Sequence, residues 1–162
     1  MGDRMNMNLS LHVIDVTDPA ASQELRELQT KAYREEAKRI GFDAIPGIDE
    51  SHEELLECPA EFYGCALDGR LAGAIAVETE QDGSRTISRL VVHPDFFRRG
   101  IGRFLLQEAL ARHAGATIHV STGEANVPAV ALYLSSGFRP DGRFEPAPGL
   151  WIARFRREPD AG

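Results

Sequence analysis

The sequence predicts one domain of the α+β class, an α/β/α sandwich in which a mixed, mostly antiparallel sheet is flanked by helices on both faces. The length of 162 residues is enough for one well-cored domain, whereas two domains of half that size would be poorly cored. Short strand-like segments joined by tight turns fill the middle of the chain, as in antiparallel hairpins. Segments of helical spacing separate the later strands, and such crossovers place helices on both faces of a sheet.

The N-terminal third predicts one strand and two helices. Asp18 can cap the first helix with Pro19 in its first turn, and Gly41 can end it. Ser51 and Glu54 have the spacing of a capping box, which predicts a short second helix. In chain order, we expect a strand within 9–16, helices over 19–40 and 51–58, strands over 61–67, 71–79 and 85–93, a helix from 101 to a stop at Gly115, a strand over 116–121, a helix over 127–136, a further short strand near Phe144 and a strand over 150–156.

The composition is that of an ordinary globular protein and excludes several classes. Apolar residues make up 43% and charged residues 27% of the chain, which rules out wholesale disorder. No apolar run approaches the roughly 20 residues that cross a bilayer, and the N-terminus lacks the apolar core of a signal peptide. We therefore expect a cytoplasmic protein without a membrane partner, in which a flexible segment (1–8) precedes a single domain (9–157) and a C-terminal tail (158–162).

The charges are distributed unevenly along the chain. The formal net charge is −7, so the protein is a poor general binder of nucleic acid. Residues 1–83 hold 7 basic and 18 acidic side chains, whereas residues 84–162 hold 11 basic and 7 acidic. One half therefore suits a cation and the other an anion, although solvated surfaces explain the charge alone equally well. Cys58 and Cys65 are too few for a disulfide framework and form no CxxC pair, so we expect reduced thiols and no metal.

The segment from Arg89 to Leu106 carries the most specific signal in the chain. It reads as a strand that enters a basic, glycine-bearing turn and then opens a helix. Such a turn directs free backbone N–H groups and the positive end of the helix dipole at a bound anion. Gly100 and Gly102 lack the Cβ atoms that would hold an anion away, and arginines surround the turn. Neither GxGxxG nor GxxxxGK[ST] is present, so a dinucleotide-binding domain or a P-loop lacks its fingerprint.

This segment resembles the acyl-CoA-binding motif of the GCN5-related N-acetyltransferase (GNAT) superfamily. In that motif a strand of L-x-V-x-P type precedes Q/R-x-x-G-x-G/A and a helix. The strand is matched by Leu90, Val92 and Pro94, and the two glycines match the turn. Phe97 stands where the family usually has Gln or Arg. The stretch 126–138 resembles a second family motif, N-x-x-A-x-x-L-Y-x-x-x-G-F, and the order of elements extends the likeness over about 9–156.

The resemblance implies a GNAT-like sheet and a single acyl-CoA N-acyltransferase domain that uses acetyl-CoA as co-substrate. In the family, acetyl-CoA lies where two neighbouring strands splay apart, here those ending near His93 and Ser121. The main chain of the first strand would pair with the pantetheine arm, the turn would hold the pyrophosphate, and a side chain downstream would contact the arm. The implied cofactor-binding residues are Leu90, Val91, Val92, Arg98, Arg99, Gly100, Ile101, Gly102, Arg103 and Asn126.

The resemblance also implies direct attack of an amine on the thioester. Tyr133 lies seven residues after Asn126 on the same helical face and would protonate the departing thiolate. A main-chain N–H near Val92 would stabilise the oxyanion. Relatives often place a glutamate base on the central strand or the next one, but Thr86 and Ser121 occupy those positions here. The base is therefore open among Glu78, Glu80, Glu124, His93 and a water chain.

The acceptor is indicated only by charge. The stretch 43–61 holds seven acids without a Lys or Arg, and relatives line the acceptor side with this region. A primary amine with a pKa near 10.4 arrives as a cation, so we expect a small or peptidic cationic amine as acceptor, and a homodimer is one expected assembly. A catalytically silent acyl-CoA-binding or regulatory module is the alternative to an N-acetyltransferase, and turnover with amines distinguishes the two.

Overall fold

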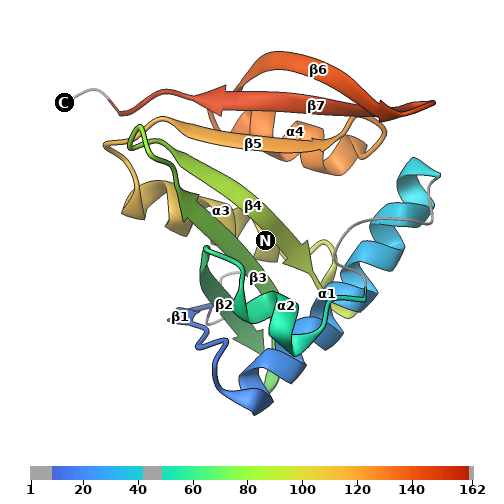
Figure 1. Ribbon diagram of the computed structural model, residues 1–162, viewed down its shortest axis with the longest axis vertical. Coiled ribbons are helices and arrows are strands. Elements are labelled where there is room, and N and C mark those ends of the chain that lie inside the picture. The colour runs from blue at the N-terminus through green and yellow to red at the C-terminus, as the bar shows by residue number, and fades with distance from the viewer. Residues whose placement is uncertain (1–8, 42–48, 161–162) are drawn as a thin grey trace.

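The computed structural model describes residues 9–41 and 49–160, which form a seven-stranded sheet in the order β1-β2-β3-β4-β5-β7-β6 (Figure 1). The elements are β1 (Leu11–Val13), α1 (Pro19–Ile40), α2 (His52–Leu56), β2 (Glu61–Leu67), β3 (Arg70–Thr79), β4 (Arg85–Val92), the 3₁₀ turn η2 (Pro94–Phe96), α3 (Ile101–Arg112), β5 (Ile118–Gly123), α4 (Val127–Ser135), β6 (Arg139–Ala147) and β7 (Leu150–Arg157). All neighbouring strands are antiparallel except β4 and β5, which are parallel. The predicted mixed, mostly antiparallel sheet is confirmed.

Helices cover both faces of the sheet, and each face has its own apolar core. Alternate residues of β3 point to opposite sides, so Ile75 and Val77 pack in a core with α3, whereas Ala74 and Ala76 pack in a core with α1 and α2. The side chain of Tyr133 from α4 belongs to the α3 core. This division is the layered sandwich that the alternation of hairpins and crossovers predicts.

The helix boundaries follow from capping residues that can be recognised in the sequence. Asp18 caps α1 by accepting a hydrogen bond from the Ala21 N–H at 3.1 Å, and Gly41 ends the helix with a φ of 77°. Ser51 and Glu54 form the predicted capping box at the start of α2. These expectations are confirmed because caps depend only on residues a few positions apart.

Three sequence expectations about the elements were wrong in detail. The first strand is shorter than 9–16, and α3 ends at Arg112, not at Gly115, because His113 closes it with bonds to two carbonyls of the last turn. The short strand near Phe144 is the nine-residue β6. Nearly all of its residues are exposed, so it shows no alternation of apolar and polar residues. As an edge strand it also tolerates Pro140 and the irregularity that follows it.

The strands β4 and β5 separate along their length, and this split positions the site. Their pairing within the described residues joins Arg85–Ile87 to Ile118–Val120, and the two ribbons then diverge (Figure 1). The split is the feature that the resemblance implied for acetyl-CoA.

A bulge in β4 sets which side chains face which layer beside the split. Val77 pairs with Ile87 and Ala76 pairs with Arg89, so Ser88 has no opposite residue on β3. The extra residue resets the alternation, so that Ile87 and Leu90 both pack in the α3 core. Arg89 therefore lies on the α1 side, where it bonds residues of α1 and of the segment before α2.

Candidate active site

A cavity of about 410 Å³ lies where the C-terminal end of β4 meets α1, the turn into α3 and the start of α4. Its walls come from segments that are far apart in the sequence. The lining residues are Ala32, Tyr33, Glu36, Arg39, Leu90, Val91, Val92, Phe96, Phe97, Arg98, Gly100, Ile101, Gly102, Asn126, Pro128, Ala129, Leu132 and Tyr133. Nine of the eleven site residues that the sequence predicts are among them.

The turn into α3 has the open geometry of an anion site. Gly100 is the N-cap with a φ of 79°, a conformation that favours glycine, and no side chain caps the helix. The first backbone N–H groups of α3 have no partner within the helix and point out of its N-terminus. At Gly102 a Cβ would lie 3.6 Å from Val92 Cγ2, which is an ordinary contact. Gly100 therefore serves the backbone conformation, whereas a Cβ at position 102 would fit without displacing a neighbour.

The arginines of the turn differ in position. Arg98 lines the cavity, together with Arg39 of α1. Arg99 lies over the ring of Phe96, with its guanidinium carbon 5.5 Å from the ring centroid. Arg103 donates a hydrogen bond to Ser135 Oγ at 3.1 Å and so links α3 to α4. Of the three predicted arginines, Arg98 is among the residues that line the cavity, and Arg39 of α1 adds a second guanidinium there.

The end of β4 presents main-chain groups to the cavity. Leu90, Val91 and Val92 pair with β3 on one side, and the described pairing with β5 stops at Ile87 on the other. All three line the cavity. The strand therefore has a free edge over these residues, which is the geometry that accepts an extended arm by strand addition.

Tyr133 is held in place at the inner end of the cavity. Its side chain is buried, and its ring packs against Phe138 and Phe155 at centroid distances of 5.7 and 5.9 Å. Burial raises the pKa of the Tyr133 phenol well above its ordinary value, and the charge of Glu36 raises it further. The hydroxyl therefore stays protonated at neutral pH and is available as a proton donor.

Asn126 connects α4 to α1 across the cavity. Its side-chain oxygen caps α4 by accepting a hydrogen bond from the Ala129 N–H at 3.4 Å. Its side chain also interacts with the Glu36 carboxyl of α1 and lowers the pKa of that group. Because the oxygen serves the cap, the amide N–H₂ is the side-chain group that can donate to this carboxylate.

Four residues of α1 line the cavity, and the sequence did not predict a site role for any of them: Ala32, Tyr33, Glu36 and Arg39. Burial raises the pKa of Tyr33 to about 12, despite the opposing charge of Arg89. Burial also raises the pKa of the Glu36 carboxyl, and the hydrogen bond from Asn126 counteracts this in part. One local signal could have indicated Glu36. It follows Ala32 by about one helical turn on the apolar face of α1, where a carboxylate is unusual.

Two of the predicted base candidates already have strong partners away from the cavity. Arg143 donates two hydrogen bonds to Glu124, and these lower the pKa of that carboxyl. Glu80 accepts a hydrogen bond from Thr86 Oγ1 at 2.6 Å in an exposed position. Neither is among the residues that line the cavity in the described part of the chain.

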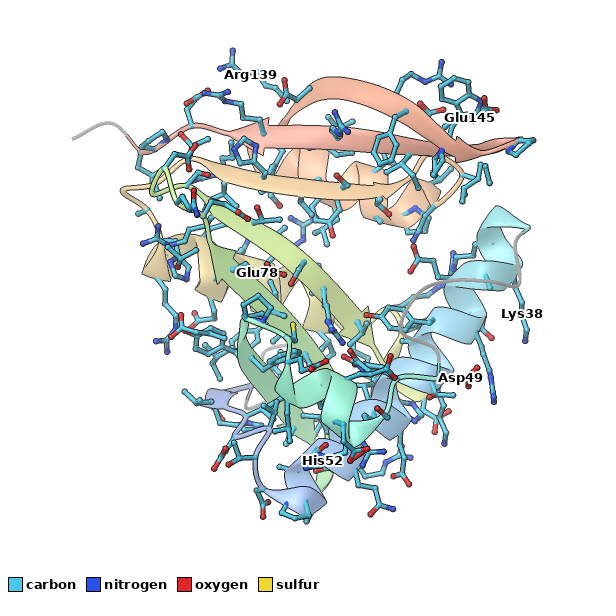
Figure 2. The ribbon with its side chains drawn as sticks, viewed as in Figure 1. Lys38, Asp49, His52, Glu78, Arg139 and Glu145 are labelled. Carbon is cyan, nitrogen blue, oxygen red and sulfur yellow. The ribbon has the colours of Figure 1, made fainter. Side chains whose placement is uncertain are left out.

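The other two candidates also lie outside the lining. Glu78 lies on β3 opposite Thr86, at the end of β4 that still pairs with β5 (Figure 2). His93 caps η2, and its Nδ1 accepts a hydrogen bond from the Asp95 N–H at 3.0 Å. Burial lowers the pKa of His93, against the charge of Asp95, so the ring is mainly neutral at pH 7.

The acidic stretch 43–61 is less free than its composition indicates. Asp43 lies outside the described residues, and so does the pair Pro46-Gly47, which is typical of a turn. Residues 1–8 and 161–162 of the expected terminal segments also lie outside them. Glu50 accepts two hydrogen bonds from Arg89, at 2.6 and 2.9 Å, in a mostly buried ion pair. Glu54 is committed to the capping box. The ion pair with Arg89 offsets the charge of Glu50, whereas Glu54 keeps its charge in an exposed position.

The thiols and the possible metal ligands of the described residues lie apart from one another. Cys58 and Cys65 are free thiols, and Cys65 is fully buried. Within 9–41 and 49–160, no group of three or more His, Cys, Asp or Glu side chains is arranged to hold a metal ion. None of the helices described is long and apolar enough to cross a membrane.

Solved structures share this fold over nearly the whole chain. The ribosomal-protein-S18-alanine N-acetyltransferase of Escherichia coli superposes with a TM-score of 0.74 at 18% sequence identity, over 95% of this chain and 96% of that one. The PaiA N-acetyltransferase of Thermoplasma acidophilum, in complex with coenzyme A, superposes with a TM-score of 0.72 at 18% identity, over 94% and 99%. The fold is therefore that of the GNAT acetyltransferases.

Sequence comparison identifies the family. The profile of the acetyltransferase (GNAT) family matches residues 22–138. The chain is 40% identical over 139 residues to the UPF0157 protein YqkA of Bacillus subtilis (strain 168), covering 85% of this chain and 40% of that protein. It is 30% identical over 122 residues to the mycothiol acetyltransferase of Mycobacterium avium (strain 104), covering 73% and 38%. The chain spans about two fifths of the length of these curated relatives, and it belongs to the acetyltransferase (GNAT) family, as its two motifs predict.

Proposed function

We propose that this protein transfers the acetyl group of acetyl-CoA to a primary amine, by direct attack of the amine on the thioester in a ternary complex. The observation that carries the proposal is the shared cavity beside the split in the sheet. The open N-terminus of α3, the free edge of β4 and the buried Tyr133 all face this one space. An acyl thioester of CoA requires three features along one cavity: an anion site, a strand edge for the arm, and a proton donor.

The residues present fit acetyl-CoA along the length of the cavity. The turn around Gly100 offers backbone N–H groups, and Arg98 and Arg39 add positive charge for a pyrophosphate. Leu90 to Val92 offer a strand edge for the two amides of a pantetheine arm. The apolar side chains of Ile101 and Leu132 line the remaining wall. Acetyl-CoA, when bound, supplies the activated thioester, and the chain supplies the groups around it.

The protein's part in the chemistry is to orient, polarise and transfer protons. A main-chain N–H at the free edge near Val92 is placed to hydrogen-bond the thioester oxygen as negative charge develops on it. The protonated hydroxyl of Tyr133 donates to the sulfur as the carbon–sulfur bond breaks. In this mechanism Cys58 and Cys65 form no covalent intermediate. The acceptor enters from the side of α1, whose residues line the opposite wall.

A thiol-release assay tests the proposal. Purified protein is incubated with acetyl-CoA and a panel of amines, polyamines, aminoglycosides, amino acids and peptides, and free CoA is measured. We expect release above the hydrolysis rate with at least one primary amine, and mass spectrometry should show an added acetyl group on its nitrogen. CoA binding by calorimetry without turnover of any amine would instead identify a catalytically silent acyl-CoA-binding module.

A further inference from the structure

Glu36 occupies a singular position in the cavity. It is the one acidic side chain among the described residues that line it, and α1 carries it on the wall that faces Tyr133 and Asn126. The neighbouring Glu35 pairs instead with Lys38 at 3.3 Å. Lys38 points away from the sheet on the outer side of α1 (Figure 2). Two adjacent glutamates of one helix therefore have opposite surroundings, and only the second reaches the reaction space.

Among the described residues, the side chain of Asn126 is the partner that acts on the Glu36 carboxylate and lowers its pKa. The same asparagine is fixed by its cap of α4. A carboxylate has two oxygens with about four acceptor positions, so one donor leaves capacity for a further proton. The restraint from α4 orients the group, and the remaining lone pairs are available to a ligand in the cavity.

The surroundings of Glu36 also suit a group that gains and loses a proton. Burial raises the pKa of its carboxyl above the ordinary value, against the opposing effect of Asn126. The charged and titratable groups that share its cavity are Tyr33 and Arg39 of α1, Arg98 of the turn and Tyr133 of α4. Both tyrosine hydroxyls stay neutral because burial raises their pKa. A base works best when its pKa lies close to the working pH.

We propose that Glu36 is the catalytic base of this enzyme, which binds the acceptor as a primary ammonium ion and removes one proton from it. This inference rests on the proposed function and identifies the chemical class of its acceptor. It assigns to a helix flanking the sheet a role for which the sequence left Glu78, Glu80, Glu124, His93 and a water chain open.

The proton and electron balance closes without another reactant. The ammonium group gives one proton to Glu36 and becomes a neutral amine. Its lone pair forms the carbon–nitrogen bond at the thioester carbonyl, and the carbon–sulfur bond breaks with its electrons on sulfur. Tyr133 protonates the thiolate, and the second proton lost by the nitrogen restores the tyrosine. The products are an N-acetyl amine, free CoA and one proton on Glu36, which passes to solvent.

The test compares Glu36→Gln with Glu35→Gln as a matched control. Glutamine keeps an oxygen that can accept the hydrogen bond from Asn126 but cannot take the proton. We expect Glu36→Gln to lower kcat/KM for the best amine at neutral pH by roughly 100- to 10,000-fold, with acetyl-CoA affinity within about threefold of wild type. The control removes a charge of the same sign from the outer face of α1 and should retain wild-type kinetics.

The pH profile separates a base from a structural link between α1 and α4. In the wild type, kcat/KM should fall with acid as Glu36 becomes protonated. In Glu36→Gln that limb should move to higher pH and follow the pKa of the amine, because only the neutral amine can react. Glu36→Ala provides a second variant, in which added formate should restore part of the turnover.

Each contrary result has a distinct meaning. If the wild type turns over an amine and Glu36→Gln keeps the same rate and the same acid limb, the role of Glu36 is overturned. The proposed function then still stands. A parallel loss of acetyl-CoA affinity and turnover, without rescue of Glu36→Ala by formate, would assign Glu36 to holding the cavity together and would also overturn that role. Absence of turnover by the wild type with every amine would contradict the proposed function itself.

Discussion

The sharpest test of the cofactor site is a negative charge placed at Gly100. This residue has a φ of 79°, and a Cβ there would meet nothing within 4 Å. A substitution therefore strains the backbone but does not clash. The strain of a left-handed L-residue is about 1–2 kcal/mol, which lowers stability and leaves the N–H groups of α3 in place. Gly100→Ala measures this strain, and Gly100→Glu adds the charge.

The magnitude follows from the distance between like charges. Two unit charges about 4 Å apart interact by about 1 kcal/mol in water and about 4 kcal/mol at the effective dielectric of a protein surface. Glu at position 100 would lie beside the expected pyrophosphate, so CoA should bind about 5- to 1,000-fold more weakly to Gly100→Glu than to Gly100→Ala. The ratio should shrink as salt is added, because salt screens exposed charges.

The assay is isothermal calorimetry with CoA at two salt concentrations, with circular dichroism as the check on folding. Gly83 provides a matched control at the far end of β4: its φ is 88°, and a Cβ there also meets nothing within 4 Å. Gly83→Glu carries the same kind of strain and the same charge and should bind CoA as the wild type does. An affinity of Gly100→Glu within twofold of that of Gly100→Ala would refute the assignment of the pyrophosphate to this turn.

Two further predictions concern the proton donor and the buried ion pair. Tyr133→Phe keeps the packed ring and should lower kcat by about 100-fold with little change in acetyl-CoA affinity; a wild-type kcat under conditions where chemistry limits the rate would return Tyr133 to a packing role. Burial alone would raise the pKa of Glu50, but the hydrogen bonds from Arg89 and Gln29 outweigh it and lower that pKa. The pair therefore stabilises the fold above the ordinary pKa of a carboxyl and loses this contribution as pH falls through the lowered value. Glu50→Gln should cost about 3 kcal/mol in urea unfolding at neutral pH and flatten the acid limb of stability, whereas an unchanged midpoint would show that the pair contributes no net stability.

The Arg89 network shows what a count of charges along the sequence leaves out. Seven acids between 43 and 61 indicated an attractive surface for a cationic acceptor. In the fold, Glu50 reaches Arg89, which the bulge at Ser88 turns towards α1, and Gln29 completes the contact at 2.9 Å. A charge count cannot register a partner that lies on another strand. The acid that does face the cavity, Glu36, lies outside that stretch.

Local signals in the sequence determined most of the elements. Asp18, Gly41 and the capping box set helix ends through interactions that span at most a few residues, and the strands β2 to β4 follow from turn residues and apolar spacing. The open turn before α3 could likewise be predicted from the sequence, because glycine conformation and an uncapped helix start are local properties. The sequence predicted only a short part of the exposed strand β6, because an edge strand without a buried face has no periodic pattern.

The sequence by itself determined the family, the order of elements and nine of the residues that line the cavity. The tertiary structure alone decided which side chains of α1 join them, and which arginines of the turn do not. The physical reason is the distance along the chain over which each kind of interaction acts. Caps, turns and periodicity act between near neighbours, whereas the meeting of Glu36 with Asn126 depends on the bulge in β4, the split from β5 and the packing of α1 on the opposite wall. These are properties of the assembled sheet that no short segment contains.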